Sequence, residues 1–121
     1  VERVIAIEES AAAIEDAYLN IDGLPNVQIV QGKTEDVLDN LIETPDAVIL
    51  DPPRAGCHKR ALARLCALAP PRLVYVSCNP ASLARDLRVL CQESYTLVEV
   101  QPIDMFPHTY HIEAIATLEK R

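Results

Sequence analysis

One cysteine of the sequence stands where a nucleophile can be activated. Cys78 lies in the string VSCNP at 76–80, between an apolar run and a helix that Asn79 can cap and Pro80 can begin. The unpaired amide groups and the positive end of a helix dipole favour a thiolate over a thiol at such a turn. The other three cysteines are two packing residues on apolar helix faces and one loop residue without a predicted partner, namely Cys66, Cys91 and Cys57. Cys78 is therefore the candidate nucleophile, with an inert turn cysteine as the alternative.

Three carboxylates lie at the ends of predicted strands. Glu8 closes an apolar run, and an acid at that place can accept hydrogen bonds from both hydroxyls of a ribose. Asp51 precedes Pro52 and Pro53, which lack backbone N–H groups and impose an extended path, so its carboxylate is held at the sheet edge. Glu113 shares a strand face with apolar side chains, and partial desolvation there favours use as a general base. The alternatives are solvated strand ends for Glu8 and Glu113 and a simple strand terminator for Asp51.

The elements that position these residues follow from hydrophobic periodicity. Apolar runs and turn signals predict strands at 4–8, 27–31, 47–50, 73–76, 96–100 and 112–118, and helices at 10–21, 34–42, 58–68 and 79–91. Strands that alternate with helices predict right-handed crossovers and a parallel sheet covered on both faces. No helix separates the last two strands, so they form an antiparallel hairpin or sit at an edge. The predicted fold is α/β and Rossmann-like, mostly parallel with an antiparallel end, in a single domain over residues 1–121.

The ends of the predicted strands indicate where a ligand would bind. In an open parallel sheet, ligands collect at the carboxyl ends of the strands. The first four strands end at Glu8, at QGK (31–33), at DPPR (51–54) and at SCNP (77–80). The alternating pattern alone predicts that these four groups lie along one edge of the sheet.

The sequence has no Gly-rich turn of the kind that adenosyl-binding domains of this class usually contain. Its three glycines are far apart, and none belongs to a GxGxxG-like loop. The first predicted strand corresponds to the second strand of such a domain. We therefore expect either a piece of a longer protein or a domain that does not bind such a cofactor unaided.

Composition limits the classes of partner. Eleven Lys and Arg against eighteen Asp and Glu give a formal net charge of −7 over 121 residues, which repels phosphate and disfavours a stand-alone nucleic-acid binder. No apolar run approaches the roughly 18 residues of a membrane helix. There is no CxxC pair and no Cys/His pair at ligand spacing, which disfavours zinc. The cysteine pattern favours reduced thiols and hence a cytoplasmic protein over a disulfide framework.

Several strings, in order along the chain, resemble those of a known family. They are DPPRAG at 51–56, VYVSCNP at 74–80, ARDL at 84–87, DMFPHT at 104–109 and HIE at 111–113. Together they are similar to motifs of the RNA 5-methyluridine methyltransferases, which are S-adenosylmethionine-dependent and act on uracil in 23S ribosomal RNA and tRNA. The likeness runs over nearly all 121 residues.

The resemblance implies roles for the four candidate residues. Cys78 corresponds to the nucleophile of the family's SCNP motif and Glu113 to the general base of its His-x-Glu motif. Glu8 and Asp51 correspond to acids that contact the cofactor. The resemblance also implies a class I methyltransferase sheet with an antiparallel last strand, S-adenosylmethionine as cofactor, and no metal. The implied partner is RNA, with 23S rRNA favoured over tRNA.

Parts of the family pattern have no counterpart in the sequence. The first strand, the Gly-rich turn and the N-terminal RNA-binding barrel are missing, and the acidic balance agrees with RNA binding by those missing parts. The chain therefore resembles the C-terminal part of a catalytic domain. By itself we expect it to bind S-adenosylmethionine weakly or not at all and to be inactive.

Two other functions stay open on the sequence. Amino-group methyltransferases carry an Asp-Pro-Pro-aromatic motif, but Arg54 replaces the aromatic residue, and the Cys78 motif has no role in attack by an amine. A non-catalytic cofactor-binding or interaction module would keep the fold alone, although Cys78 and Glu113 are both present. His108 and His111, in the loop before the last strand, are expected to be positioning groups or surface residues and not metal ligands.

Overall fold

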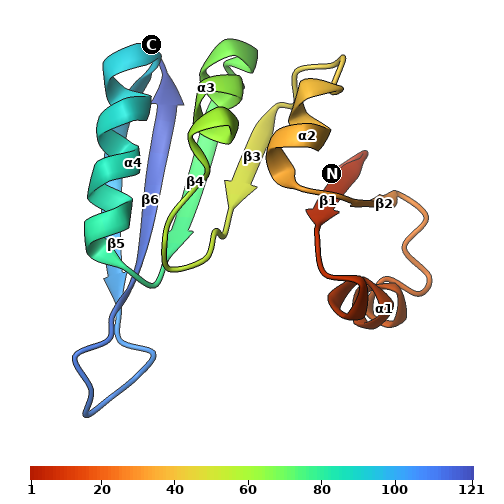
Figure 1. The fold of residues 1–121 in the computed structure, drawn as a ribbon, viewed down its shortest axis with the longest axis horizontal. Coiled ribbons are helices and arrows are strands. Elements are labelled where there is room, and N and C mark those ends of the chain that lie inside the picture. The colour runs from red at the N-terminus through yellow and green to blue at the C-terminus, as the bar shows by residue number, and fades with distance from the viewer. The chain divides into compact units, whose positions relative to one another are not determined.

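The computed structural model describes residues 1–121, which divide into unit 1 (residues 1–42) and unit 2 (residues 43–121). Each unit is compact (Figure 1). Unit 1 contains β1 (Val4–Glu8), α1 (Ala11–Asn20), β2 (Val27–Gln31) and α2 (Thr34–Asp39). β1 and β2 pair in parallel, as a strand–helix–strand unit requires. That residues 1–121 act as one domain stays a prediction.

Local signals set the helix ends of unit 1. The Ser10 hydroxyl caps α1 and accepts a hydrogen bond from the Ala13 amide at 3.4 Å. The predicted helix at 34–42 ends earlier, because Asn40 forms its C-cap. The Asn40 side-chain amide donates to the Asp36 carbonyl oxygen at 2.9 Å, which satisfies a carbonyl of the last turn without another helical residue.

Unit 2 contains a four-stranded sheet. Its elements are β3 (Ala47–Leu50), α3 (Lys59–Leu68), β4 (Arg72–Ser77), α4 (Pro80–Glu93), β5 (Tyr95–Ile103) and β6 (Glu113–Lys120). The strand order is β3-β4-β6-β5; β3 and β4 are parallel, and β6 is antiparallel to both β4 and β5. Three strands therefore run in one direction and only β6 opposes them. This confirms the predicted α/β fold with an antiparallel C-terminal strand and the hairpin of the last two strands.

Both helices of unit 2 lie on the same face of its sheet (Figure 1). The steps from β3 to β4 and from β4 to β5 go in the same direction along the sheet, so right-handed crossovers place α3 and α4 on one side. Within unit 2 both helices therefore cover one face, and helices on both faces of a sheet formed by the whole chain stay a prediction. Ile49, which points to the other face, is 74% exposed.

The core of unit 2 lies between the two helices and the sheet. Buried residues alternate along β4 and β6, as a sheet with one covered face requires. Its main apolar members are Leu62, Leu65, Leu73, Tyr75, Leu83, Leu87, Leu90, Ala116 and Leu118. The four cysteines are free thiols. None of the helices combines the length and the apolar composition that crossing a membrane requires.

Candidate active site

The carboxyl ends of β3 and β4 form one edge of unit 2. Asp51 directly follows β3 and Cys78 directly follows β4, and the parallel pair Leu50–Tyr75 keeps the two strand ends adjacent. The Asp51 side chain is exposed and Cys78 is half-buried. The structure therefore brings the predicted cofactor acid and the predicted nucleophile to the same edge of one sheet.

Glu113 reaches this edge from the opposite direction. It begins β6, which runs antiparallel to β4, and the pair Ser77–Ala114 is the last one in the register. Cys78 and Glu113 each lie one residue beyond that pair, so the backbone places them next to each other at the ends of neighbouring strands. Glu113 is half-buried, whereas Ala114 faces the core. A carboxylate and a thiol thus share one end of the sheet, although the two residues are 35 positions apart in the sequence.

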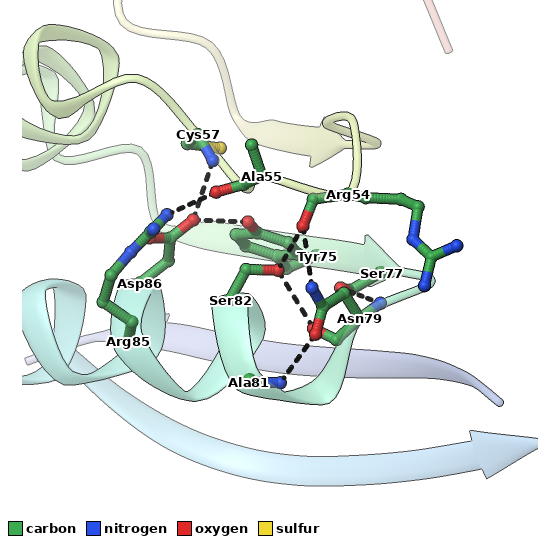
Figure 2. Close-up of polar contacts among 10 residues, drawn as sticks. All are labelled: Arg54, Ala55, Cys57, Tyr75, Ser77, Asn79, Ala81, Ser82, Arg85 and Asp86. Atoms are coloured by element: carbon green, nitrogen blue, oxygen red, sulfur yellow. Dashed lines mark hydrogen bonds and ion pairs between the residues drawn. The ribbon is translucent and has the colours of Figure 1, made fainter. Parts of the chain in front are cut away.

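A dense set of hydrogen bonds shapes the turn that carries Cys78. The Asn79 amide donates to the Ser77 hydroxyl oxygen at 3.1 Å, and that hydroxyl donates to the Asn79 carbonyl oxygen at 3.0 Å. The Asn79 side-chain oxygen accepts from the Ala81 amide at 3.0 Å and caps α4, with Pro80 in the first turn (Figure 2). The residues on both sides of Cys78 are therefore fixed, which confirms the helix start predicted at Asn79-Pro80.

Glu8 lies at the corresponding edge of unit 1. It ends β1 opposite Gln31, and its carbonyl oxygen accepts a hydrogen bond from the Gly32 amide at 3.0 Å. Its exposed carboxylate accepts from the Ser10 amide at 2.7 Å, which orients it at the strand end. Glu8 belongs to unit 1 and Asp51 to unit 2, and their expected alignment stays a prediction.

A buried carboxylate that the sequence reasoning missed holds this region together. Asp86 on α4 has no exposed side-chain surface. One of its oxygens accepts from the Tyr75 hydroxyl at 2.6 Å and from the Cys57 amide at 2.8 Å, and the other accepts from Nε and Nη2 of Arg85 at 2.9 and 2.7 Å. Arg85 also donates to the Ala55 carbonyl oxygen at 2.8 Å (Figure 2). Asp86 therefore links β4, α4 and the loop that follows β3.

The sequence contained a signal for Asp86. The residue falls on the apolar face of α4, three positions after Leu83 and four before Leu90, where a carboxylate is costly unless it is fully hydrogen-bonded. The string ARDL at 84–87 contributes to the family resemblance, which gives Asp86 no role. Periodicity could have identified Asp86 as a buried charge, but not the loop groups that bind it.

Replacing Asp86 with alanine should strongly destabilise the protein. The Tyr75 hydroxyl and the Cys57 amide would lose their shared acceptor inside the core, and at about 1–3 kcal/mol for each unsatisfied group we expect the free energy of unfolding to fall by about 2–6 kcal/mol. Urea unfolding of the complete protein, followed by circular dichroism, measures the change. Asp16→Ala, at an exposed helical aspartate, is the control and should stay within about 0.5 kcal/mol. Equal effects of the two substitutions would contradict this assignment.

Cys57 has partners that were not predicted. Burial raises the pKa of its thiol to about 11, and a hydrogen bond with the Tyr75 side chain partly opposes that rise. Burial also raises the pKa of the Tyr75 hydroxyl, and its bond to Asp86 adds to the shift. Cys57 is thus a half-buried, protonated thiol at neutral pH and is unsuited to be the nucleophile.

Cys57 should react slowly with iodoacetamide. With a pKa of about 11, roughly one thiol in a thousand is ionised at pH 8, so we expect alkylation about a hundredfold slower than for a free cysteine. The ordinary value of 9.0 applies in the unfolded chain, so this thiol is ionised more easily there. Burial of the protonated Cys57 thiol therefore contributes fully to the free energy of unfolding below about pH 9, and this contribution is lost as the pH rises to about 11. Peptide mass spectrometry of labelled protein, with the urea-unfolded chain as control, measures the rates; equal rates would contradict the prediction.

An exposed aromatic group lies in the loop between β5 and β6. The His111 ring is 4.3 Å from the Tyr110 ring and 6.3 Å from the Phe106 ring, measured between centroids. The Thr109 hydroxyl donates to the Phe106 carbonyl oxygen at 2.7 Å and accepts from the His111 amide at 3.2 Å. His111 is therefore held within the loop that leads into Glu113. Nowhere in residues 1–121 do three or more His, Cys, Asp or Glu side chains come together as metal ligands would.

Comparison with solved structures defines the class of the fold. A precorrin-6y C5,15-methyltransferase from Geobacter metallireducens superimposes with a TM-score of 0.77 over 98% of this chain and 67% of that one, at 16% identity. At such low identity the likeness concerns the fold alone. The α/β architecture is that of the methyltransferases.

Similarity in sequence as well as fold defines the family. The model of the tRNA (Uracil-5-)-methyltransferase family matches residues 1–121. The Pyrococcus abyssi tRNA (uracil-54, C5)-methyltransferase, solved with S-adenosyl-L-homocysteine, is 38% identical with a TM-score of 0.84 over 96% of this chain and 28% of that one. An uncharacterized RNA methyltransferase from Caldanaerobacter subterraneus is 46% identical, over 97% of this chain. The chain belongs to the tRNA (uracil-5-)-methyltransferase family and spans about 27% of the length of that bacterial relative.

Proposed function

We propose that the complete protein transfers a methyl group from S-adenosylmethionine to C5 of a uracil in RNA. The observation that carries this proposal is the placement of Cys78 and Glu113 at the ends of neighbouring antiparallel strands, one residue beyond the Ser77–Ala114 pair. A nucleophile and a base on one sheet edge are what this reaction requires. Family membership supports the reaction class.

The proposed chemistry begins at Cys78, because uracil C5 is a poor nucleophile. The Cys78 thiolate forms a bond to C6, and the electrons of the C5–C6 double bond move into an enolate with density on C5. C5 then forms a bond to the sulfonium methyl carbon, whose bond to sulfur breaks and leaves S-adenosylhomocysteine. C5 now carries both a methyl group and a proton. The Glu113 carboxylate removes that proton, the double bond re-forms, and the C6–S bond breaks to release Cys78.

The carboxylates at the strand ends fit an adenosyl cofactor. Asp51 is exposed, and Pro52 and Pro53 offer no backbone N–H groups that would compete for its oxygens. Glu8 is exposed at the end of β1 and already oriented by Ser10. We assign both residues to cofactor contacts, with carboxylates that can accept hydrogen bonds from hydroxyl groups of the ligand.

RNA is the proposed partner, bound through segments outside this chain. A formal net charge of −7 supports this division, because phosphate binding needs cations that residues 1–121 do not supply in excess. Of the two RNA classes we propose 23S rRNA, with tRNA as the alternative; tRNA is the RNA named for the Pyrococcus abyssi enzyme.

We also propose that the protein works in the cytoplasm and that residues 1–121 alone are inactive. Micromolar affinity of the isolated chain for S-adenosylmethionine in calorimetry would contradict the last point.

Nucleoside mass spectrometry tests the proposed function. The complete protein is incubated with S-adenosylmethionine and, separately, with 23S rRNA and tRNA that lack 5-methyluridine. We expect 5-methyluridine in the 23S rRNA sample, whereas its appearance in tRNA alone would keep the chemistry and change the substrate. Methylated amino groups on other bases would replace the proposal by an amino-group methyltransferase. Cofactor binding without methylation would favour a non-catalytic module.

A further inference from the structure

The loop that follows β3 (residues 51–58, the Asp51 loop) is attached to α4 close to Cys78. The Arg54 carbonyl oxygen accepts hydrogen bonds from the Asn79 side-chain amide at 3.0 Å and from the Ser82 hydroxyl at 2.9 Å (Figure 2). Asn79 is the residue next to Cys78, and Arg54 lies three positions after Asp51. One side-chain amide therefore joins the loop of the proposed cofactor acid to the turn of the proposed nucleophile.

The rest of this loop also fits closely against α4. Gly56 has a φ of +84°, and a Cβ atom built on it would meet Nη2 of Arg85 and lie 2.5 Å from Oδ2 of Asp86. The loop therefore has no room for a single methyl group at this point. Its beginning is fixed as well, since Leu50 pairs with Tyr75 in the sheet. Asp51 thus lies between two anchored ends.

We propose that Asn79 is a positioning residue that holds the Asp51 loop and the Cys78 turn in one fixed arrangement. Its side-chain oxygen caps α4 at Ala81, and its side-chain N–H group donates to the Arg54 carbonyl oxygen. Ser82, Arg85 and Asp86 attach the same loop to the body of α4, but only the Asn79 side chain joins it to the turn that carries Cys78. This inference rests on the proposed function, in which Asp51 contacts the cofactor and Cys78 attacks the base. Misplacement of reacting groups by about 1 Å can cost about a hundredfold in rate.

Two substitutions separate the capping role of Asn79 from its bond to Arg54. Serine at position 79 caps a helix about as well as asparagine, but its short hydroxyl cannot reach the Arg54 carbonyl oxygen. Alanine loses both interactions. We expect Asn79→Ser and Asn79→Ala to lower kcat alike, by about tenfold or more, while only Asn79→Ala lowers the melting temperature. KM for RNA should change less than about twofold in both, because RNA binding is assigned to other segments.

A matched pair of glycine variants provides a second test. Gly56→Ala and Gly23→Ala both place alanine at a positive φ, +84° and +79°, but the Gly23 position has no heavy atom within 4 Å of the added Cβ. The backbone strain is therefore similar, and only Gly56→Ala pushes the loop away from α4. We expect Gly56→Ala alone to raise the Kd of S-adenosylhomocysteine, by about tenfold.

The readouts distinguish failure of this inference from failure of the proposed function. Wild-type kcat in Asn79→Ser, or equal ligand affinity of the two glycine variants, would overturn the positioning role and leave uracil methylation intact. If the wild-type protein methylates no uracil, the proposed function fails. Calorimetry of S-adenosylhomocysteine binding to the Asn79 and glycine variants still tests the loop attachment in that case, and unchanged affinity would overturn it.

Discussion

Cys78→Ala should abolish methyl transfer, with a loss of about a thousandfold or more in kcat, because no other group at this sheet edge can attack C6 of uracil. The same substitution should abolish a covalent complex with RNA that contains 5-fluorouracil. In the unsubstituted protein this complex should accumulate, since C5 carries fluorine in place of the proton that Glu113 removes. Denaturing gel electrophoresis of the complete protein with labelled RNA detects the complex.

Cys91→Ala is the matched control for this experiment. Cys91 is a half-buried thiol on α4, the same helix that begins just after Cys78, but it lies near the helix end remote from the proposed site. The control should lower stability to some extent and still form the complex with RNA. A covalent complex that persists in Cys78→Ala would assign the nucleophile to another residue and remove the basis of the proposed reaction.

Glu113→Gln should stop the reaction after methyl transfer. The amide has almost the shape of the carboxylate but cannot accept the C5 proton, so Cys78 stays bonded to C6 of the methylated ring. We expect one methyl group transferred per protein molecule, followed by turnover about 10²–10⁴-fold slower. Unlike the fluorinated substrate, ordinary RNA should now give a stable covalent complex.

Quench-flow counting of transferred methyl groups, together with denaturing electrophoresis, measures this outcome. Glu119→Gln is the control, because Glu119 lies on the same strand at the other end of β6 and pairs with Arg72 at the surface. The Glu119→Gln variant should methylate RNA at the wild-type rate over many turnovers. Multiple turnovers by Glu113→Gln at the wild-type rate would exclude Glu113 as the base.

Local sequence determined most of the elements. Ser10 and Asn79 as caps and Pro80 in the first turn predicted the starts of α1 and α4, and alternation along 112–118 predicted β6, because these signals act within a few residues. The strand predicted at 96–100 is longer in the structure, where β5 spans Tyr95–Ile103. The helix at 34–42 was predicted too long, because the helical spacing of Leu41 and Ile42 does not reveal that the Asn40 side chain caps the helix at Asp36.

The position of β6 could not be obtained in the same way. The sequence allowed the last strand to lie at an edge or in a hairpin, and the structure places it between β4 and β5. Ala114, Ala116 and Leu118 are buried, which suits a strand with neighbours on both sides. β5 carries Pro102 and takes the edge, where a missing backbone donor costs little.

The sequence by itself therefore determined the identity of the candidate groups, their order and the strand ends on which they sit. Only the tertiary structure decided which of them lie together. The β4–β6 register places Cys78 and Glu113 at neighbouring strand ends, and loop packing brings Asp86 to Tyr75, Cys57 and Arg85. The physical reason is the separation along the chain of the residues that interact. Caps and periodicity depend on neighbours a few residues away, whereas strand pairing and the hydrogen bonds of a buried carboxylate join groups that are distant in the chain and meet only when the whole core has formed.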